Sequence, residues 1–211
     1  MRNPCRRALL IVDVQNEYLD GNLRIEYPDP KRSLRNIERA MLAAREAAIP
    51  VIVAQNTGPV GSPIFAPGSA GWALHPSVGR QPRDHYVEKR LPSAFAGTDL
   101  AQWLERHLVD TLCLSGYMTH NCIAATAFQA LHAGLAVEVL SDATGSVPYA
   151  NGAGRASARD IHQAFCVVFQ SRFAAVATTE RWIAAVRSGS ALPRDTIYAS
   201  NQNALLAQAS S

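Results

Sequence analysis

The stretch TLCLSGYMTHNCIAATAFQALHAGLAVEVL, residues 111–140, contains the unit that decides the fold. Two short apolar runs, 111–116 and 135–140, flank an alanine-rich segment with a helical pattern over 122–134, which ends at Gly134. Glycine is common just after a helix because it adopts the left-handed backbone conformation at little cost. A strand, a helix and a second strand in this order are typical of a βαβ unit. The stretch therefore predicts two parallel strands joined by a crossover helix.

The same alternation of apolar runs and helical patterns continues on both sides of this unit. Further strands are expected at 7–14, 51–56, 85–89 and 174–178, and further helices at 33–48, 98–108, 156–169 and 179–188. Because βαβ crossovers are right-handed, helices should cover both faces of such a sheet. We therefore predict a three-layer α/β/α domain over residues 1–188, built on a doubly wound sheet of about six mostly parallel strands.

Three segments lie at or beyond the edges of this pattern. The helix over 33–48 is expected to begin at Ser33, because serine side chains cap helix N-termini. Residues 57–84 interleave glycine and proline but also contain large apolar side chains, so we expect an ordered loop folded over the domain. Residues 189–211 are polar with little apolar periodicity, and they are predicted to form a tail, either loosely attached or used in oligomer contacts.

Composition and charge argue against several classes of function. The chain has 211 residues and a net charge of +3, and its scattered basic residues do not suggest a nucleic-acid surface. The apolar run at 8–12 is far too short to span a membrane. Four cysteines without a C-x-x-C pair favour neither a zinc site nor a disulfide framework. We expect a cytoplasmic protein that binds a small molecule, with no nucleic-acid or membrane partner.

Three polar residues are expected at the carboxyl ends of strands, where open parallel sheets bind their ligands. Asp13 follows the first strand, Lys89 ends the third, and Cys122 stands where the helix after the fourth should begin. Each has an ordinary alternative, namely a turn-capping carboxylate, a solvated lysine or a packed cysteine. Brought together, they would supply a base, an electrostatic partner and a nucleophile. The helix N-terminus is expected to lower the pKa of the Cys122 thiol.

Three blocks of the sequence resemble the signature blocks of the isochorismatase-like cysteine hydrolases. They are LLIVDVQN (9–16), EKRLPSAFAGTDL (88–100) and GYMTHNCIAATAFQA (116–130). Residues 134–146 and 158–180 resemble later blocks of the family, so that the resemblance extends over most of the chain in the family's order. It implies the isochorismatase-like hydrolase fold and a homo-oligomer, either a dimer or a tetramer.

The resemblance also implies a role for each candidate residue. Asp13 falls on the general base, Lys89 on the lysine that supports its charge, and Cys122 on the nucleophile. A cis peptide bond is implied between Tyr117 and Met118, which would aim the Met118 N–H, together with the Cys122 N–H, at a developing oxyanion. The implied reaction is hydrolysis of a C–N bond in a small amide, ureide or carbamoyl substrate through a Cys122 thioester, with no cofactor.

Substrate-binding residues are predicted around these three groups. They are Gln15, Tyr18, Trp72, Phe95, Tyr117, Thr119 and His120. Nicotinamidases of the resembled family hold a metal with an Asp-x-His pair after the second strand, but residues 54–65 contain neither Asp nor His. No metal is therefore expected, and His75 and His85 are not expected to bind one. Two alternatives stay open: a vinyl-ether hydrolase acting on isochorismate, and a non-catalytic α/β binding protein that kept the motifs.

Overall fold

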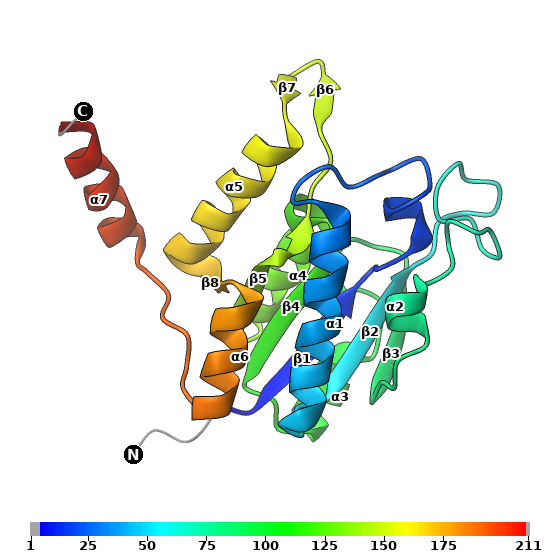
Figure 1. The fold of residues 1–211 in the computed structure, drawn as a ribbon, viewed down its shortest axis with the longest axis horizontal. Helices are drawn as coiled ribbons and strands as arrows, with labels where there is room; N and C mark the ends of the chain where they lie inside the picture. The colour runs from blue at the N-terminus through cyan, green and yellow to red at the C-terminus, as the bar shows by residue number, and fades with distance from the viewer. Residues whose placement is uncertain (1–4, 210–211) are drawn as a thin grey trace.

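The computed structural model describes residues 5–209 and has a six-stranded sheet at its centre (Figure 1). Its strands are β1 (Arg7–Val12), β2 (Val51–Asn56), β3 (His85–Lys89), β4 (Thr111–Tyr117), β5 (Ala136–Gly145) and β8 (Ala175–Ala177). They lie in the order β3-β2-β1-β4-β5-β8, and every neighbouring pair is parallel. The chain runs outward from β1 through β2 and β3, then returns to the other side of β1 at β4. The predicted doubly wound parallel sheet is confirmed.

Helices cover both faces of this sheet (Figure 1). They are α1 (Pro30–Glu46), α3 (Leu100–Arg106), α4 (Ala124–His132), α5 (Ala158–Val168) and α6 (Thr179–Ser188). Because successive strand residues point to opposite faces, Leu9 joins the core with α1 and α6, where Trp182 is fully buried. Leu10 joins the opposite core with α3 and α4, including Trp103. Burial on both faces explains why β1 reads as one continuous apolar run.

The first helix begins earlier than the sequence pattern predicts. Its N-cap is Asp29, whose carboxylate accepts a hydrogen bond from the Arg32 N–H at 2.9 Å, and Pro30 occupies the first turn. Both features are favourable at a helix start, because proline there sacrifices no intrahelical hydrogen bond. Ser33 therefore lies inside α1, and its hydroxyl oxygen is 2.6 Å from the hydroxyl oxygen of Tyr117. The predicted cap instead links α1 to the end of β4.

A hairpin that the sequence pattern did not reveal precedes α5. It consists of β6 (Tyr149–Asn151) and β7 (Gly154–Ala156), which pair antiparallel and project from the domain (Figure 1). All of its residues are exposed, so no alternation of buried and exposed side chains marks it in the sequence. The 57–84 segment also contains a short helix, α2 (Pro76–Gly79), and is tied to the region after β1 by a bridge between Leu74 and Gln15.

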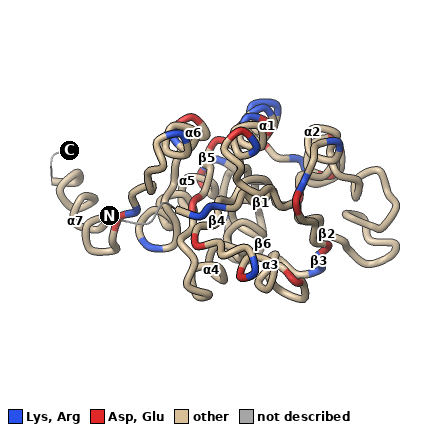
Figure 2. Tube along the Cα trace, turned by 90° about the horizontal axis from the view of Figure 1, so that it is seen from below, with Lys and Arg blue, Asp and Glu red and all other residues tan. Residues whose placement is uncertain are grey.

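The predicted tail contains one more helix, α7 (Ile197–Ala209), which stands away from the sheet (Figure 1). None of its residues is buried, and none is charged (Figure 2). On α1 and α6, by contrast, acidic and basic side chains are mixed (Figure 2). The homo-oligomer implied by the resemblance stays a prediction. Over residues 5–209, no helix combines the length and the apolar character needed to span a membrane.

Gly116 allows β1 and β4 to approach closely beside the end of β1. Its φ is +110°, a conformation that residues with a side chain rarely adopt. A Cβ at this position would collide with the backbone carbonyl oxygen of Val12. Val12 and Gly116 are paired in the sheet immediately before Asp13 and the turn to Cys122. The glycine thus determines how closely the two strands that carry these residues come together.

We expect Gly116→Ala to lower the free energy of unfolding for two reasons. The new Cβ would collide with the carbonyl oxygen of Val12, and alanine would have to adopt a positive φ. Gly134→Ala is the matched control, because Gly134 has φ of +86° but no atom within 4 Å of the point where a Cβ would lie. The control should lose about 1–2 kcal/mol from the backbone conformation alone. Gly116→Ala should lose about 2 kcal/mol more, as overpacking does in well-packed interiors. Urea unfolding measures both, and equal losses would contradict the close approach.

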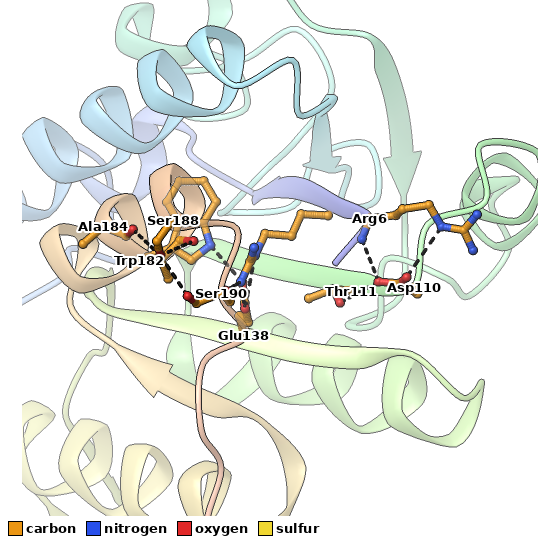
Figure 3. Close-up of polar contacts among 10 residues, drawn as sticks. Arg6, Asp110, Thr111, Glu138, Trp182, Ala184, Ser188 and Ser190 are labelled. Atoms are coloured by element: carbon orange, nitrogen blue, oxygen red, sulfur yellow. Dashed lines mark hydrogen bonds and ion pairs between the residues drawn. The ribbon is translucent and has the colours of Figure 1, made fainter. Parts of the chain in front are cut away.

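A buried ion pair lies at the start of β1, at the opposite end of this strand from Asp13. Figure 3 shows its surroundings, with Glu138 and Trp182 labelled. The guanidinium of Arg7 contacts both carboxylate oxygens of Glu138, with Nη2 2.8 Å from Oε1 and Nε 3.0 Å from Oε2. The indole N–H of Trp182 donates a hydrogen bond to Glu138 at 2.9 Å, and Arg7 also donates to the carbonyl of Ser190. The cluster therefore ties the segment that follows α6 to β1 and β5.

Removing one member of this cluster should destabilise the fold strongly. Glu138→Ala leaves the Arg7 guanidinium buried without its counter-charge, for which a loss of about 3–5 kcal/mol is expected. Arg6→Ala is the control, since the pair between Arg6 and Asp110 in Figure 3 is largely exposed and should contribute less than about 1 kcal/mol. Denaturant unfolding compares the two variants. A loss for Glu138→Ala as small as that for Arg6→Ala would contradict the importance of the buried pair.

Candidate active site

The three candidate residues meet at the carboxyl edge of the sheet. Asp13 directly follows β1, Lys89 is the last residue of β3, and Cys122 lies in a π-helical turn, η2 (Thr119–Ile123), after β4. The Nζ atom of Lys89 is 2.7 Å from Oδ2 of Asp13 and 3.3 Å from Sγ of Cys122. All three side chains are buried. The structure therefore brings together a carboxylate, an ammonium and a thiol that are far apart in the sequence.

Lys89 reaches this position across the end of β2. Its ammonium also donates hydrogen bonds to Oδ1 of Asn56 at 3.3 Å and to the carbonyl oxygen of Leu91 at 3.2 Å. Burial alone would lower the pKa of Lys89, but the charges of Asp13 and Cys122 outweigh burial and raise it. Lys89 therefore stays protonated and holds its charge between the carboxylate and the sulfur.

Asp13 is held in an unusual backbone conformation, with φ of +52°. Its own N–H donates to the carbonyl of Ala54 at 2.9 Å, which fixes the residue beside β2. Burial raises the pKa of Asp13, and the Lys89 ammonium offsets only part of that effect. A carboxylate with a raised pKa is a stronger base than a solvated aspartate, which suits it to accept the thiol proton.

Cys122 does not have the lowered pKa expected from a helix N-terminus. Burial, followed by the charge of Asp13, raises its pKa to about 12, and Lys89 compensates only in part. The helical segment also begins at Thr119, so Cys122 is not in the first position, where the helix end acts most strongly. The expectation of a thiolate stabilised by the helix is wrong. The resting thiol keeps its proton and must transfer it to become a nucleophile.

The peptide bond between Tyr117 and Met118 is cis, as the resemblance implies. Within the described chain, the Met118 N–H makes no hydrogen bond, and the Cys122 N–H makes none outside its own helical turn. The Met118 N–H is thus a free backbone donor at the start of the turn that carries Cys122. Such donors stabilise the negative charge that develops on a carbonyl oxygen during nucleophilic attack.

Several of the predicted substrate-binding side chains are engaged within the protein. The amide of Gln15 bonds to the backbone of Asn56 and to the carbonyl of Trp72, and it thereby ties the 57–84 segment to β1 and β2. The indole N–H of Trp72 donates to the hydroxyl of Thr57 at 2.9 Å. Phe95 packs in the core that contains α3 and α4.

The remaining predicted residues lie around the sulfur or support the turn that carries it. The Tyr117 hydroxyl contacts Ser33, and the Thr119 hydroxyl is 3.0 Å from Nδ1 of His162, a residue that sequence reasoning took no further. The Tyr18 ring packs against the ring of Tyr117, with centroids 5.5 Å apart, and burial followed by the charge of Cys122 raises its pKa well above the ordinary value. His120 also lies in η2, two residues before Cys122.

Residues that sequence reasoning did not assign to the site also contribute. Asn56 lies at the end of β2, where its side chain accepts a hydrogen bond from Lys89. Its position at a strand end is a sequence signal that could have identified it. Ser146, whose hydroxyl oxygen is 3.0 Å from Nδ1 of His120, and Tyr149, whose ring packs against that imidazole, follow β5 in a segment without periodic pattern. No sequence signal distinguished these two.

Two histidines outside the site, His75 and His85, have structural partners. Nδ1 of His75 accepts a hydrogen bond from the Ser77 N–H at the start of α2, and Nε2 of His85 is 2.9 Å from Oδ1 of Asp99. Over residues 5–209, no three His, Cys, Asp or Glu side chains are grouped so that they could hold a metal ion.

A family model described as the isochorismatase domain matches residues 7–181, most of the chain. The chain belongs to the isochorismatase family. The Asp13, Lys89 and Cys122 cluster lies inside the matched region, as do the cis peptide and the turn that carries the sulfur. The resemblance seen in the sequence blocks is therefore confirmed over the whole domain.

Solved and curated members of the isochorismatase family are similar to this chain. An isochorismatase-family protein from Burkholderia xenovorans LB400 is 62% identical, with a TM-score of 0.97 over 98% of this chain and 100% of that chain. Streptothricin hydrolase from Streptomyces noursei is 36% identical over 137 residues, which are 65% of this chain and 49% of the relative. The match thus spans about half the length of that enzyme. Ureidoacrylate amidohydrolase from Methylobacterium radiotolerans is 29% identical over a segment that covers 67% of this chain and 68% of that enzyme. The chain is a hydrolase of the isochorismatase family.

Proposed function

We propose that this protein is a cysteine hydrolase that cleaves a C–N bond of a small amide, ureide or carbamoyl substrate. The observation that carries the proposal is the contact of one ammonium with both a carboxylate and a thiol, with Lys89 Nζ 2.7 Å from Asp13 and 3.3 Å from Cys122. In this arrangement a proton can move from the sulfur to the carboxylate. The Lys89 ammonium stays beside whichever of the two groups is negative, so no unpaired charge forms in the buried site.

The first half of the reaction forms a thioester. The substrate carbonyl carbon approaches Sγ of Cys122, and its oxygen takes hydrogen bonds from the N–H groups of Met118 and Cys122. As the C–S bond forms, the thiol proton moves to Asp13, and the electron pair of the carbonyl moves to its oxygen. The tetrahedral intermediate collapses when Asp13 returns that proton to the nitrogen, which leaves as ammonia or an amine.

The second half of the reaction restores the enzyme. Asp13, again ionised, takes a proton from a water molecule as the oxygen of that water attacks the thioester carbon. The C–S bond breaks, the product leaves as a carboxylic or carbamic acid, and the sulfur regains the proton held by Asp13. Lys89 stays charged throughout, and it stabilises whichever of Asp13 and Cys122 carries the negative charge.

The raised thiol pKa agrees with this sequence of steps. A Cys122 thiol with a pKa of about 12 is protonated near neutral pH, so it becomes a nucleophile only when a base such as Asp13 accepts its proton. Proton transfer to Asp13 becomes favourable only when the oxyanion forms and its negative charge is stabilised. The family relationship to an enzyme named ureidoacrylate amidohydrolase supports an amide-type substrate.

The experiment that tests the proposal is a substrate screen on the purified protein. Small primary amides, ureides and carbamoyl compounds are assayed for release of ammonia or amine, and isochorismate is assayed for release of pyruvate. Cys122→Ala is the blank for both assays. We expect nitrogen release that Cys122→Ala abolishes. Cysteine-dependent pyruvate release without nitrogen release would instead identify a vinyl-ether hydrolase, and no turnover in either assay would favour a binding protein.

A further inference from the structure

His120, in the turn that carries the nucleophile, has a polar atom that the fold leaves without a partner. Its Nδ1 lies 3.0 Å from the hydroxyl oxygen of Ser146. Its ring is packed nearly perpendicular to Tyr149, with centroids 5.0 Å apart, and also contacts Phe165. The other ring nitrogen, Nε2, is buried and has no hydrogen-bond partner within residues 5–209. Buried polar atoms are nearly always paired, so an exception within two residues of Cys122 points to a ligand.

The His120 imidazole is neutral in this environment. Burial lowers its pKa to about 4, so at neutral pH one ring nitrogen carries hydrogen and the other accepts. The Ser146 hydroxyl can turn either to donate to Nδ1 or to accept from it. Nε2 can therefore act as an acceptor or as a donor, and it can pair with the N–H or the C=O of an amide.

Tyr149 packs its ring against His120 from the β6–β7 hairpin. Burial and then the charge of Cys122 raise the Tyr149 pKa, so its phenol is protonated. Tyr149 also lines a surface cavity of about 570 Å³ together with residues 21–24, Glu26, Val147 and Pro148. Its ring thus lies between this cavity and His120, two residues before Cys122.

We propose that His120 and Tyr149 recognise the group next to the scissile bond, and that this group is uncharged and shares a hydrogen bond with Nε2 of His120. The inference rests on the proposed function and narrows its substrate class to neutral primary amides and ureides. The charges that contact the sulfur, those of Asp13 and Lys89, already pair with each other. Arg24 and Glu26, which line the cavity beside Tyr149, are exposed to solvent. An ionised substituent buried at Nε2 of His120 would lose its hydration without gaining a buried counter-charge.

Two alkylating reagents of similar size test the charge preference at Cys122 directly. Iodoacetamide carries a neutral primary amide, whereas iodoacetate carries a carboxylate at the same position. The rate for each is measured on the Cys122 peptide by mass spectrometry, with N-acetylcysteine as the reference thiol. The ratio of the iodoacetamide rate to the iodoacetate rate should be about tenfold higher at Cys122 than for the reference. Equal ratios would overturn the preference for uncharged groups.

Two substitutions of His120 separate recognition from structural support. His120→Asn keeps an amide that can reach Ser146 but has no atom at the position of Nε2, whereas His120→Gln places its amide near that position and gives up Ser146. We expect iodoacetamide alkylation of Cys122 to fall about tenfold in His120→Asn and to be largely retained in His120→Gln. The reverse order would show that His120 only supports Ser146, and it would overturn the proposal.

Substitution of Tyr149 completes the test. Tyr149→Phe keeps the ring against His120 and should preserve the reagent ratio, whereas Tyr149→Ala opens the site to water and should move the ratio towards that of N-acetylcysteine. An unchanged ratio in Tyr149→Ala would show that Tyr149 takes no part in recognising the substrate.

If Cys122 of the folded wild type reacts with neither reagent, the proposed function itself fails, and this inference fails with it. Equal reactivity of the reagents overturns the inference alone.

Discussion

Replacing Cys122 with alanine is expected to lower kcat/KM by at least about 10⁴-fold, because the atom that forms the thioester is removed. The N–H groups of Met118 and of residue 122 would remain and could still polarise a carbonyl, but no nucleophile would face it. The change deletes one buried atom, so the fold should survive. Steady-state kinetics on a substrate found in the amide and ureide screen measures the loss, and circular dichroism verifies the fold.

The matched control for this prediction is Cys5→Ala. Cys5 lies before β1 and is partly exposed, at the edge of the sheet opposite the candidate active site. Its substitution should change kcat/KM by less than about twofold, since exposed positions away from the chemistry have small effects. Turnover in folded Cys122→Ala within a factor of ten of the wild type would rule out the thioester mechanism.

Asp13→Asn is expected to lower kcat by about 10²–10⁴-fold, because an amide cannot accept the thiol proton or return it to the leaving nitrogen. The wild type should also lose activity on the acid side as Asp13 becomes protonated. Because burial raises the Asp13 pKa above the ordinary value of 3.8, this loss should begin at a higher pH than for a solvated aspartate. The pH dependence of kcat/KM in the wild type and variant measures both effects.

Two further variants separate catalysis from folding in this experiment. Asp13→Asn leaves the buried Lys89 ammonium without its counter-charge, which could unfold the protein. Combining Asp13→Asn with Lys89→Met removes both charges together, and this double variant should be folded yet equally inactive. Asp99→Asn, at a largely exposed aspartate, should retain wild-type activity. A folded double variant with near-wild-type turnover would exclude Asp13 as the base.

Much of the fold could be predicted from the sequence because its signals are local. A strand buried on both faces must be apolar throughout, so β1, β2 and β4 are visible as short apolar runs. Helices with one buried face show spacings of three and four residues. Right-handed crossovers then leave few ways to order the strands. The β6–β7 hairpin escaped because none of its residues is buried, so burial imposes no alternating pattern on it.

The main residues of the candidate site were also predictable, but its electrostatics were not. Asp13 could be found because it is a charged residue directly after a buried strand, and Lys89 because it ends a strand with a half-apolar pattern. The direction of the Cys122 pKa depended on a balance between the helix end, burial and a neighbouring carboxylate. Only the folded chain sets the distances and the burial that decide this balance, and burial with the charge of Asp13 outweighs the Lys89 ammonium.

By itself, the sequence determined the α/β class, the order of its elements, and the presence of a carboxylate, an ammonium and a thiol at the ends of three strands. These follow from local patterns and from the topology of parallel sheets. Only the tertiary structure decided that Lys89 reaches both Asp13 and Cys122, that the thiol is protonated at rest, and that Nε2 of His120 lacks a partner within residues 5–209. Those properties depend on distances between atoms of residues far apart in the chain, which no local pattern encodes.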